Sequence, residues 1–272
     1  MKPAPARLLI IAGSDSSGGA GIQADIKTAT AFGVYAMTAI TAITVQNTTG
    51  LGAIHPVPAS IVHDQIRYVL DDIGADAIKI GMLGSTDIVD AVADALDKRK
   101  STPIVLDPVL ASTSGTSLLD TDAISALTSR LFPLATLVTP NIPEAAHLAG
   151  MDICNDEQIV QAAAKLRAFG ARNVLIKGGH AEGDLIRDVL IGESCKDIFE
   201  GTRIGTRAVH GTGCTLSTAI ACGLARRESL PEAIKRARAY LRRALEEAPD
   251  IGRGSRPLHH MHAIPINETV RD

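Results

Sequence analysis

Residues 8–32 read LLIIAGSDSSGGAGIQADIKTATAF and contain the pattern that decides the fold: an apolar run, a glycine-rich loop and a segment of helical period. The same alternation continues along the chain, and it favours a mainly parallel sheet flanked by helices. Predicted strands lie at residues 8–12, 36–45, 77–80, 104–106, 137–139 and 173–177. Predicted helices lie at residues 20–32, 60–72, 87–98, 121–130, 155–169, 213–225 and 231–247. Residues 186–191 and 197–201 predict a small antiparallel addition near the end of the sheet.

The composition is that of an ordinary globular protein. The 272 residues are 46% hydrophobic and 21% charged, and the net charge of -3 gives no electrostatic reason to expect nucleic acid. Four cysteines without a C-x-x-C pair predict reduced thiols in a cytoplasm. The apolar run at residues 8–12 is too short for a signal peptide or a membrane span. With no repeat or linker in the sequence, we expect one domain, residues 1–272, and a small-molecule partner.

The residues that follow the predicted strands are polar and rich in glycine. In open α/β sheets, ligands bind beyond the carboxyl ends of the strands. Five such ends carry the motifs GSDSSGGAG (13–21), KIGM (79–82), DPV (107–109), PNIPE (140–144) and KGGH (177–180). Each of them could be an ordinary turn, but five together predict a rim that binds a charged ligand.

A further motif, Gly211-Thr212-Gly213-Cys214, precedes an apolar stretch of helical period. Glycines let main-chain N–H groups converge, and the positive end of the following helix favours an anion such as phosphate. A thiol in the first helical turn should have its ionised form favoured, so Cys214 could act as a base or a nucleophile. The alternative is a glycine turn before a buried helix, with a small cysteine in the core.

The first glycine-rich loop is neither a Walker A loop nor a G-x-G-x-x-G motif. Phosphoryl transfer without a P-loop still needs donors around the phosphoryl group, a cation on the nucleotide phosphates and a base near the acceptor. Lys177 could supply a point charge, while Asp107 and Glu144 could hold Mg²⁺, directly or through water, with Asn141 orienting them. For the two acidic residues, the alternatives are a helix cap or a surface charge.

The motifs of the chain also resemble those of a known family. The stretch GSDSSGGAGIQADIKT (13–28) looks like the opening signature of the hydroxymethylpyrimidine and phosphomethylpyrimidine kinases of thiamine biosynthesis, which belong to the ribokinase superfamily. The resemblance continues through VQNT (45–48), KIGML (79–83), DPV (107–109), TPNIPEA (139–145), KGGH (177–180), HGTGCTLS (210–217) and PLHHMH (257–262). It spans nearly the whole chain and implies a ribokinase-like α/β fold with helices on both faces of the sheet.

This resemblance implies an ATP-dependent kinase that phosphorylates 4-amino-5-hydroxymethyl-2-methylpyrimidine and then its monophosphate, in one site. It implies that Gln46 binds the amino and ring-nitrogen edge of the pyrimidine, because an amide donates and accepts together. The remaining pocket would be lined by Ala20, Asp25, Met82 and Val109. Lys177 would face the ATP phosphates, Asn141 and Glu144 the metal–phosphate region, and Gly211, Thr212, Gly213 and Cys214 the transferring phosphoryl group. Cys214 stands where sugar kinases of the superfamily carry an aspartate base, and the family implies a homodimer.

Several features leave alternatives open. Many family members have Lys-Ser-Gly where this chain has Thr113-Ser114-Gly115, which puts the second phosphorylation in doubt. The histidines at 259, 260 and 262 suggest a tail packed on the body more than a metal site, because no carboxylate or cysteine lies beside them. The basic residues from Lys235 to Arg243 are interpreted as a solvated helix face. Two other functions remain: a pyridoxine or pyridoxal kinase of the same superfamily, and a non-catalytic pyrimidine- or nucleotide-binding protein.

Overall fold

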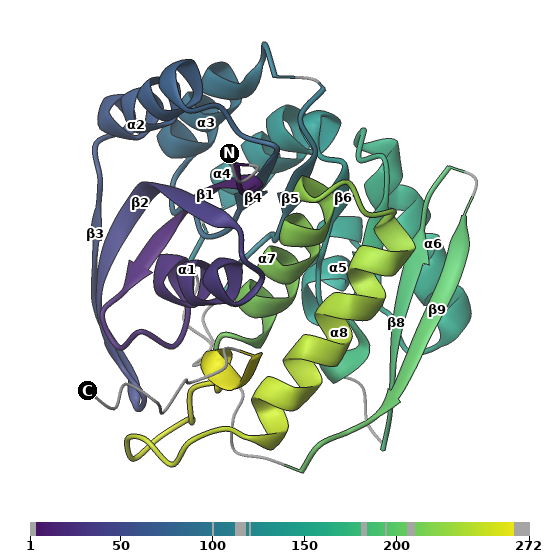
Figure 1. Ribbon diagram of the computed structural model, residues 1–272. Helices are drawn as coiled ribbons and strands as arrows, with labels where there is room; N and C mark the ends of the chain where they lie inside the picture. The colour runs from purple at the N-terminus through teal and green to yellow at the C-terminus, as the bar shows by residue number, and fades with distance from the viewer. Residues whose placement is uncertain are drawn as a thin grey trace, which may run out of the picture.

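The computed structural model describes residues 4–99, 101–111, 118–119, 121–180, 184–193, 195–205 and 210–263. Within these residues, nine strands form one sheet in the order β3-β2-β1-β4-β5-β6-β7-β8-β9 (Figure 1). The strands are β1 (Arg7–Asp15), β2 (Tyr35–Asn47), β3 (Gly50–Pro56), β4 (Ala77–Ile80), β5 (Ile104–Leu106), β6 (Leu137–Val138), β7 (Val174–Ile176), β8 (Leu185–Ile191) and β9 (Lys196–Thr202).

The centre of the sheet is parallel and its two edges are antiparallel. Strands β2, β1, β4, β5, β6 and β7 pair in parallel, whereas β3 pairs antiparallel with β2, and β8 and β9 continue antiparallel from β7. The predicted mainly parallel sheet with a small antiparallel addition is therefore confirmed. The carboxyl ends of β1, β4, β5, β6 and β7, five of the six parallel strands, meet along one edge, as the sequence pattern predicted.

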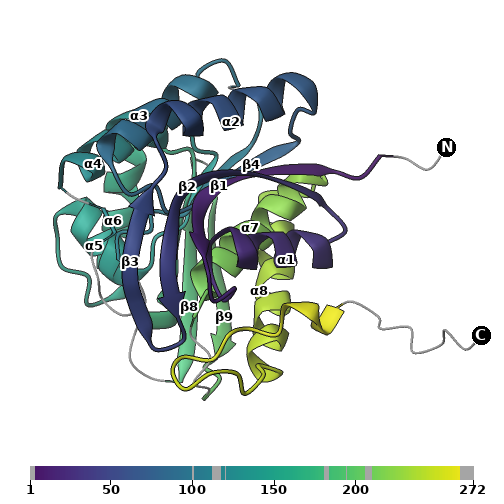
Figure 2. The same cartoon turned by 90° about the vertical axis from the view of Figure 1, so that its left-hand side faces the viewer.

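Helices cover both faces of the sheet, as Figure 2 shows. One face packs against α2 (Ala59–Asp72), α3 (Thr86–Leu96), α4 (Thr121–Ala126), α5 (Ile142–Ala149) and α6 (Asp156–Ala168). The other face packs against α1 (Gly21–Ala31), α7 (Thr212–Ala225) and α8 (Leu230–Glu246).

Strand β1 explains why its sequence is a continuous apolar run. Leu9 and Ile11 point into the core on one face of the sheet, while Leu8 and Ile10 point into the core on the other, and all four are fully buried. A parallel strand with helices on both sides has no solvent face, so no polar alternation appears in its sequence.

Two elements were absent from the sequence prediction. Strand β3 is short of apolar alternation, contains two glycines and ends at Pro56, so no strand signal marks it. Helix α5 has only eight residues, and its signals are local: Asn141 caps it, Pro143 lies in the first turn, and Gly150 ends it in the left-handed region. A capping box of Asn141 and Glu144 was therefore readable from the sequence as a helix start.

The helix predicted at residues 121–130 changes type within the chain. It is α-helical to Ala126, continues as a π-helical turn over Leu127–Leu131, and ends as a 3₁₀ turn over Phe132–Leu134. Two short 3₁₀ turns lie at Gly178–His180 and His260–Ala263.

In the described part of the chain, no helix combines the length and apolar character that crossing a membrane requires.

Candidate active site

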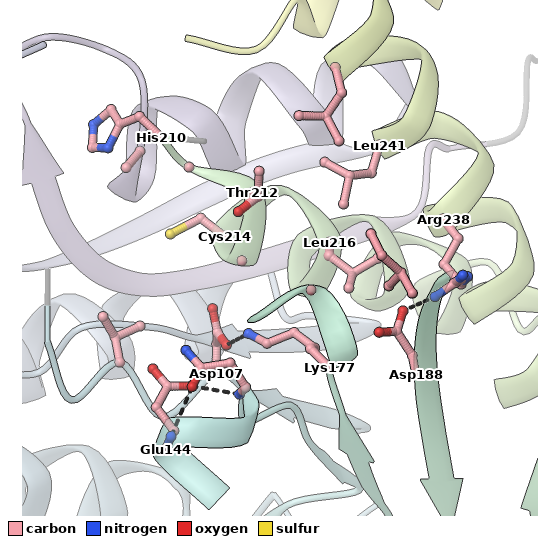
Figure 3. A pocket seen from close by; sticks show the side chains of 18 of the residues that line it. Asp107, Glu144, Lys177, Asp188, His210, Thr212, Cys214, Leu216, Arg238 and Leu241 are labelled. Carbon is pink, nitrogen blue, oxygen red and sulfur yellow. Dashed lines mark hydrogen bonds and ion pairs between the residues drawn. The ribbon is translucent and has the colours of Figure 1, made fainter. Parts of the chain in front are cut away.

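A cavity of about 930 Å³ lies along the carboxyl ends of the parallel strands and extends between β8, β9 and α8. Twelve residues proposed from the sequence line it: Ala20, Gln46, Met82, Asp107, Val109, Asn141, Glu144, Lys177, Gly211, Thr212, Gly213 and Cys214. In Figure 3, Asp107, Glu144 and Lys177 lie across the cavity from Thr212 and Cys214, and Arg238 and Leu241 of α8 lie toward its other end. The rim predicted from five strand ends is thus one continuous lining.

Gly211 begins α7 and requires the left-handed backbone conformation that favours glycine. Its φ is 83°, and a Cβ at this position would collide with the carbonyl oxygen of Gly19 in the first glycine-rich loop. Because Gly211 has no side chain, the first turn of α7 receives no side-chain cap from its N-cap residue. The two glycine-rich motifs are therefore in direct contact, and the positive end of α7 faces the cavity.

A buried ion pair lies opposite this turn. Lys177 Nζ is 2.8 Å from Asp107 Oδ1, which also accepts a hydrogen bond from Thr139 Oγ1 at 3.0 Å. Burial alone would raise the pKa of Asp107, but the Lys177 and Lys79 ammonium groups outweigh it and hold that pKa below its ordinary value. A Cβ at Gly213 would lie 3.3 Å from both Asp107 Oδ2 and Lys177 Nζ, so α7 begins against this pair.

Glu144 lies in the first turn of α5 and faces the same region. Asn141 accepts a hydrogen bond from the Glu144 N–H at 2.8 Å, and the Glu144 side chain accepts one from the Asn141 N–H at 2.8 Å. Burial raises the pKa of Glu144 to about 7, against the attraction of Lys177 and together with repulsion from Asp107. The side chain is partly exposed and lines the cavity. Asn141 and Glu144 form a helix cap, the alternative that the sequence left open for Glu144, and both also line the cavity. A role of Glu144 in holding Mg²⁺ stays a prediction.

Two lining residues that sequence reasoning did not assign are Asp15 and His210. His210 Nε2 lies 2.8 Å from Asp15 Oδ2 and 3.4 Å from Gln46 Nε2. Burial alone would raise the pKa of Asp15, but hydrogen bonds from His210, Ser17 and main-chain N–H groups hold it well below its ordinary value. The signal was present, because Asp15 belongs to the opening motif and His210 precedes Gly211, but only the fold shows that they meet.

The structure corrects the expectation that the helix end favours the thiolate of Cys214. Burial raises the pKa of this thiol to about 11, and the nearby Lys79 ammonium only partly opposes this. The prediction considered the helix end and left out the loss of water around the sulfur, which is the larger effect here. Cys214 is therefore a neutral thiol at pH 7 in the free protein.

Asp25 does not line the cavity, which corrects a second expectation. It is fully buried on α1, where Oδ2 pairs with Lys79 Nζ at 2.8 Å and Oδ1 accepts a hydrogen bond from Thr218 Oγ1 at 2.7 Å. Thr218 is one helical turn beyond Cys214 on α7, so the ion pair lies beneath the cavity floor. Buried charges require partners, and Lys79 provides one where a polar ligand was expected.

Part of the basic face of α8 also lines the cavity, and its Lys235 and Arg242 are exposed, as expected of a solvated face. Lys235, Arg238 and Arg242 share one helix face and line the end of the cavity near β8 and β9. Arg238 pairs with Asp188, which also accepts a hydrogen bond from the Gly178 N–H at 2.8 Å. Sequence spacing alone could not show that the sheet edge lies beside this face.

Two further predictions concern the histidine-containing tail and residues 113–115. The histidine-containing tail packs on the body as expected, because His260 is buried and its carbonyl accepts a hydrogen bond from Tyr240 OH. Within the described ranges, no group of three or more His, Cys, Asp or Glu residues is placed to hold a metal ion. Thr113, Ser114 and Gly115 lie outside the described residues.

Comparison with known proteins places these features in a family. A family model described as phosphomethylpyrimidine kinase matches residues 15–259. A hydroxymethylpyrimidine/phosphomethylpyrimidine kinase of Rhizobium meliloti is 47% identical over 257 residues, covering 93% of this chain and 96% of its own. A thiamine biosynthesis bifunctional protein of Geobacter sulfurreducens is 47% identical over 266 residues, and the chain spans 54% of its length.

Solved structures of two related kinases share the fold of this chain. Pyridoxal kinase of Bacillus subtilis, solved as an ADP complex, superimposes with a TM-score of 0.88 at 36% identity, covering 95% of this chain and 98% of its own. Phosphomethylpyrimidine kinase of Clostridium difficile superimposes with a TM-score of 0.78 at 40% identity, covering 87% of this chain and 97% of its own.

Proposed function

Because this chain belongs to the phosphomethylpyrimidine kinase family, we propose that it transfers the γ-phosphoryl group of ATP to 4-amino-5-hydroxymethyl-2-methylpyrimidine. The same site then phosphorylates the monophosphate to the diphosphate, for thiamine biosynthesis. The observation that carries this proposal is that one cavity contains the N-terminus of α7 with glycine as its N-cap residue, the Lys177–Asp107 pair and the amide of Gln46.

The phosphates of ATP bind between the first turn of α7 and Lys177. The N–H groups of residues 212–214 supply main-chain donors and the positive end of the helix, and Lys177 supplies a positive charge. Lys177 stays charged because its pKa is raised: burial alone would lower it, but Asp107 and Glu144 outweigh burial. Such donors stabilise the charge that develops on the phosphoryl oxygens during transfer.

Magnesium is the proposed metal, and the donors present suit it. Asp107 and Glu144 are the two carboxylates that line this part of the cavity, and Asp107 is already paired with Lys177. Mg²⁺ in kinases is held by one or two carboxylates, waters and the phosphates themselves, so a complete protein ligand set is not required. When bound, the ion neutralises phosphate charge, and Asn141 holds Glu144 in place for it.

The acceptor pyrimidine binds against Gln46, in the part of the cavity near His210 and Asp15. An amide offers both a donor and an acceptor to the amino and ring-nitrogen edge of the pyrimidine. Thr44 donates a hydrogen bond to Gln46 Oε1 at 3.2 Å, which orients the amide. Ala20, Met82 and Val109 form the apolar walls, so recognition combines one polar edge with a shaped pocket.

Cys214 is the proposed proton acceptor for the hydroxymethyl group. With a pKa of about 11, only about one thiol in ten thousand is ionised at pH 7. In the loose transition state of phosphoryl transfer, little bonding to the acceptor has formed, so positioning and charge neutralisation supply most of the acceleration. Lys79, the positive group that most lowers this thiol pKa, increases the thiolate fraction.

The test is an ADP-release assay that offers hydroxymethylpyrimidine, its monophosphate, pyridoxal and ribose in parallel. We expect turnover of the first two, and a fall of about 10² to 10⁴ in kcat for Cys214→Ala. If the free-enzyme thiolate is required, the ratio of wild-type to Cys214→Ala kcat/KM rises about tenfold per pH unit between pH 7 and pH 9. Because Glu144 also titrates near pH 7 in both proteins, its effect on kcat/KM cancels in this ratio. Nucleotide binding without turnover of any acceptor would instead favour a non-catalytic binding protein.

Pyridoxal is the second candidate acceptor, because pyridoxal kinases are among the superimposable structures. Both acceptors are small aromatic rings that carry a hydroxymethyl group. The kcat/KM values for the two alcohols rank them, because discrimination between substrates is set by that ratio.

The proposal also covers the location, the domain organisation and the oligomeric state of the protein. We place the enzyme in the cytoplasm as one kinase domain, residues 1–272, and as a homodimer. The exposed Ile43 and Val45 on β2 support association, because apolar side chains on one strand gain by being covered. Light scattering during gel filtration tests the dimer, and a single cooperative unfolding transition tests the single domain.

A further inference from the structure

The described segment that follows α8 contacts two elements of the active site, the turn between β2 and β3 and the start of α7. We call residues 252–260 the strap. Its first half packs against Thr48, which lies between β2 and β3, two residues after Gln46. Thr48 O accepts a hydrogen bond from the Ser255 N–H at 2.9 Å, and Thr48 Oγ1 accepts one from the Gly254 N–H at 3.3 Å. The strap is thus bonded to the turn beside the acceptor-binding amide.

The contact with Thr48 leaves no room for a side chain at Gly252 or Gly254. A Cβ at Gly254 would collide with the Thr48 carbonyl oxygen, and one at Gly252 would collide with the Thr48 side chain. Glycine is therefore required at position 254 by the close approach of two backbones. Any added atom there must push the β2–β3 turn away from the strap.

The second half of the strap holds the phosphate-binding turn from both sides. Pro257 forms a β-bridge with His210, the residue before Gly211. Thr215, the residue after Cys214, has its Oγ1 2.9 Å from His260 Nε2. His260 is 3% exposed, and its carbonyl accepts a hydrogen bond from Tyr240 OH at 2.7 Å. Figure 1 shows this yellow end of the described chain beside the start of α7.

The geometry points to the strap as a positioning element of the active site: Gly254 and Thr48 set the place of Gln46, and His260 sets the place of Cys214 through Thr215. The inference rests on the proposed function, because it assigns these residues to the alignment of acceptor and phosphoryl donor. The rate depends steeply on the alignment of the reacting groups, since a displacement of about 1 Å can lower it about 10²-fold. A strap that only stabilised the fold would leave the kinetic constants of the folded protein unchanged.

The acceptor side is tested with Gly254→Ala, and Gly50→Ala is the matched control. Gly50 begins β3 on the same hairpin, and a Cβ there meets no atom within 4 Å. We expect Gly254→Ala to raise KM for hydroxymethylpyrimidine about tenfold while KM for ATP stays within about twofold. Gly50→Ala should change neither. If Gly254→Ala does not fold, Thr48→Val replaces it, because this substitution removes only the hydroxyl acceptor.

The phosphoryl side is tested with Thr215→Val, which keeps the shape of the side chain and removes its hydroxyl. We expect kcat to fall about tenfold, and Thr215→Ser, which keeps the hydroxyl, to restore it to within about twofold of wild type. A lower melting temperature with unchanged kcat and KM in both sets of variants would overturn the inference and leave the strap a stabilising segment.

Amide hydrogen exchange separates failure of this inference from failure of the proposed function. Gly254→Ala should speed exchange in residues 44–50 and 211–216 relative to Gly50→Ala, whatever acceptor the enzyme uses. Equal exchange in the two variants would refute the strap even if wild type phosphorylates the pyrimidine. Absence of turnover in wild type would refute the proposed function but leave this exchange result to be read on its own.

Discussion

Replacement of Lys79 by methionine tests the electrostatic arrangement beneath the active site. Lys79 and Asp25 are both fully buried and 2.8 Å apart, and Thr218 is the other side chain that bonds the carboxylate. Methionine keeps the length of the side chain but leaves the carboxylate without its counter-charge. Removal of one partner from a buried ion pair costs about 3–5 kcal/mol. We therefore expect the free energy of unfolding of Lys79→Met to fall by this amount at pH 8.

The loss should depend on pH in a defined direction. Burial already raises the pKa of Asp25 against the attraction of Lys79, and without Lys79 it rises further. A carboxyl whose folded pKa exceeds its unfolded pKa of about 3.9 loses stability as the pH rises, at about 1.4 kcal/mol per unit of difference. The destabilisation relative to wild type should therefore be smaller at pH 5 than at pH 8.

Urea unfolding at both pH values measures these differences. The double variant Lys79→Met with Asp25→Asn removes both charges and should recover most of the stability, because the amide still accepts from Thr218. Lys196→Met, at an exposed site on β9, is the control and should change stability by less than about 0.5 kcal/mol. A loss below about 1 kcal/mol that is equal at the two pH values would refute the argument.

Three further predictions concern the Cys214 thiol, Gly211 at the start of α7, and His260 in the strap. Iodoacetamide should alkylate Cys214 of the free protein half-maximally near pH 11, after the exposed Cys154 has reacted. Peptide mass spectrometry follows both cysteines, and equal rates at pH 7 would contradict a neutral thiol at Cys214. Gly211→Ala should lower kcat about 10²-fold or more and destabilise the protein by about 1–3 kcal/mol, whereas Gly33→Ala, at φ 65° in open space, should lower stability alone. Equal kcat in the two variants would exclude phosphate binding at the first turn of α7. Burial lowers the pKa of His260 to about 4, so the stability that depends on neutral His260 is complete above pH 6.5 and falls by about 3 kcal/mol as the pH falls toward 4. Urea unfolding of wild type and His260→Asn at pH 7 and pH 4.5 measures this loss, and the same pH dependence in both proteins would refute it.

The sequence was sufficient for most of the backbone. Each predicted strand was found, because continuous apolar runs and period-2 runs are local signals of burial on two faces or one. The missing elements, β3 and α5, are those whose local signal is weak or short. The helix cap formed by Asn141 and Glu144 shows that one of them was readable from a capping pattern that the strand-end interpretation passed over.

Twelve of the thirteen candidate residues line one cavity, but the sequence did not predict their chemical state. The predicted residues that gather at the strand ends do so because parallel strands share one carboxyl edge. The state of Cys214 depended on water excluded by the surrounding elements, and the role of Asp25 depended on Lys79, which is 54 residues away along the chain. Neither neighbour appears in the local pattern that suggested the role.

By itself the sequence determined the order of strands and helices, the glycine-rich turns and membership of a kinase family, because these depend on residues close together in the chain. Only the tertiary structure decided that Cys214 is a neutral thiol, that Asp25 lies beneath the cavity, that a face of α8 lines it, and that Gly254 meets Thr48 across 206 residues. The physical reason is that burial and charge pairing are set by all the atoms within a few ångströms, and most of those atoms come from distant parts of the chain.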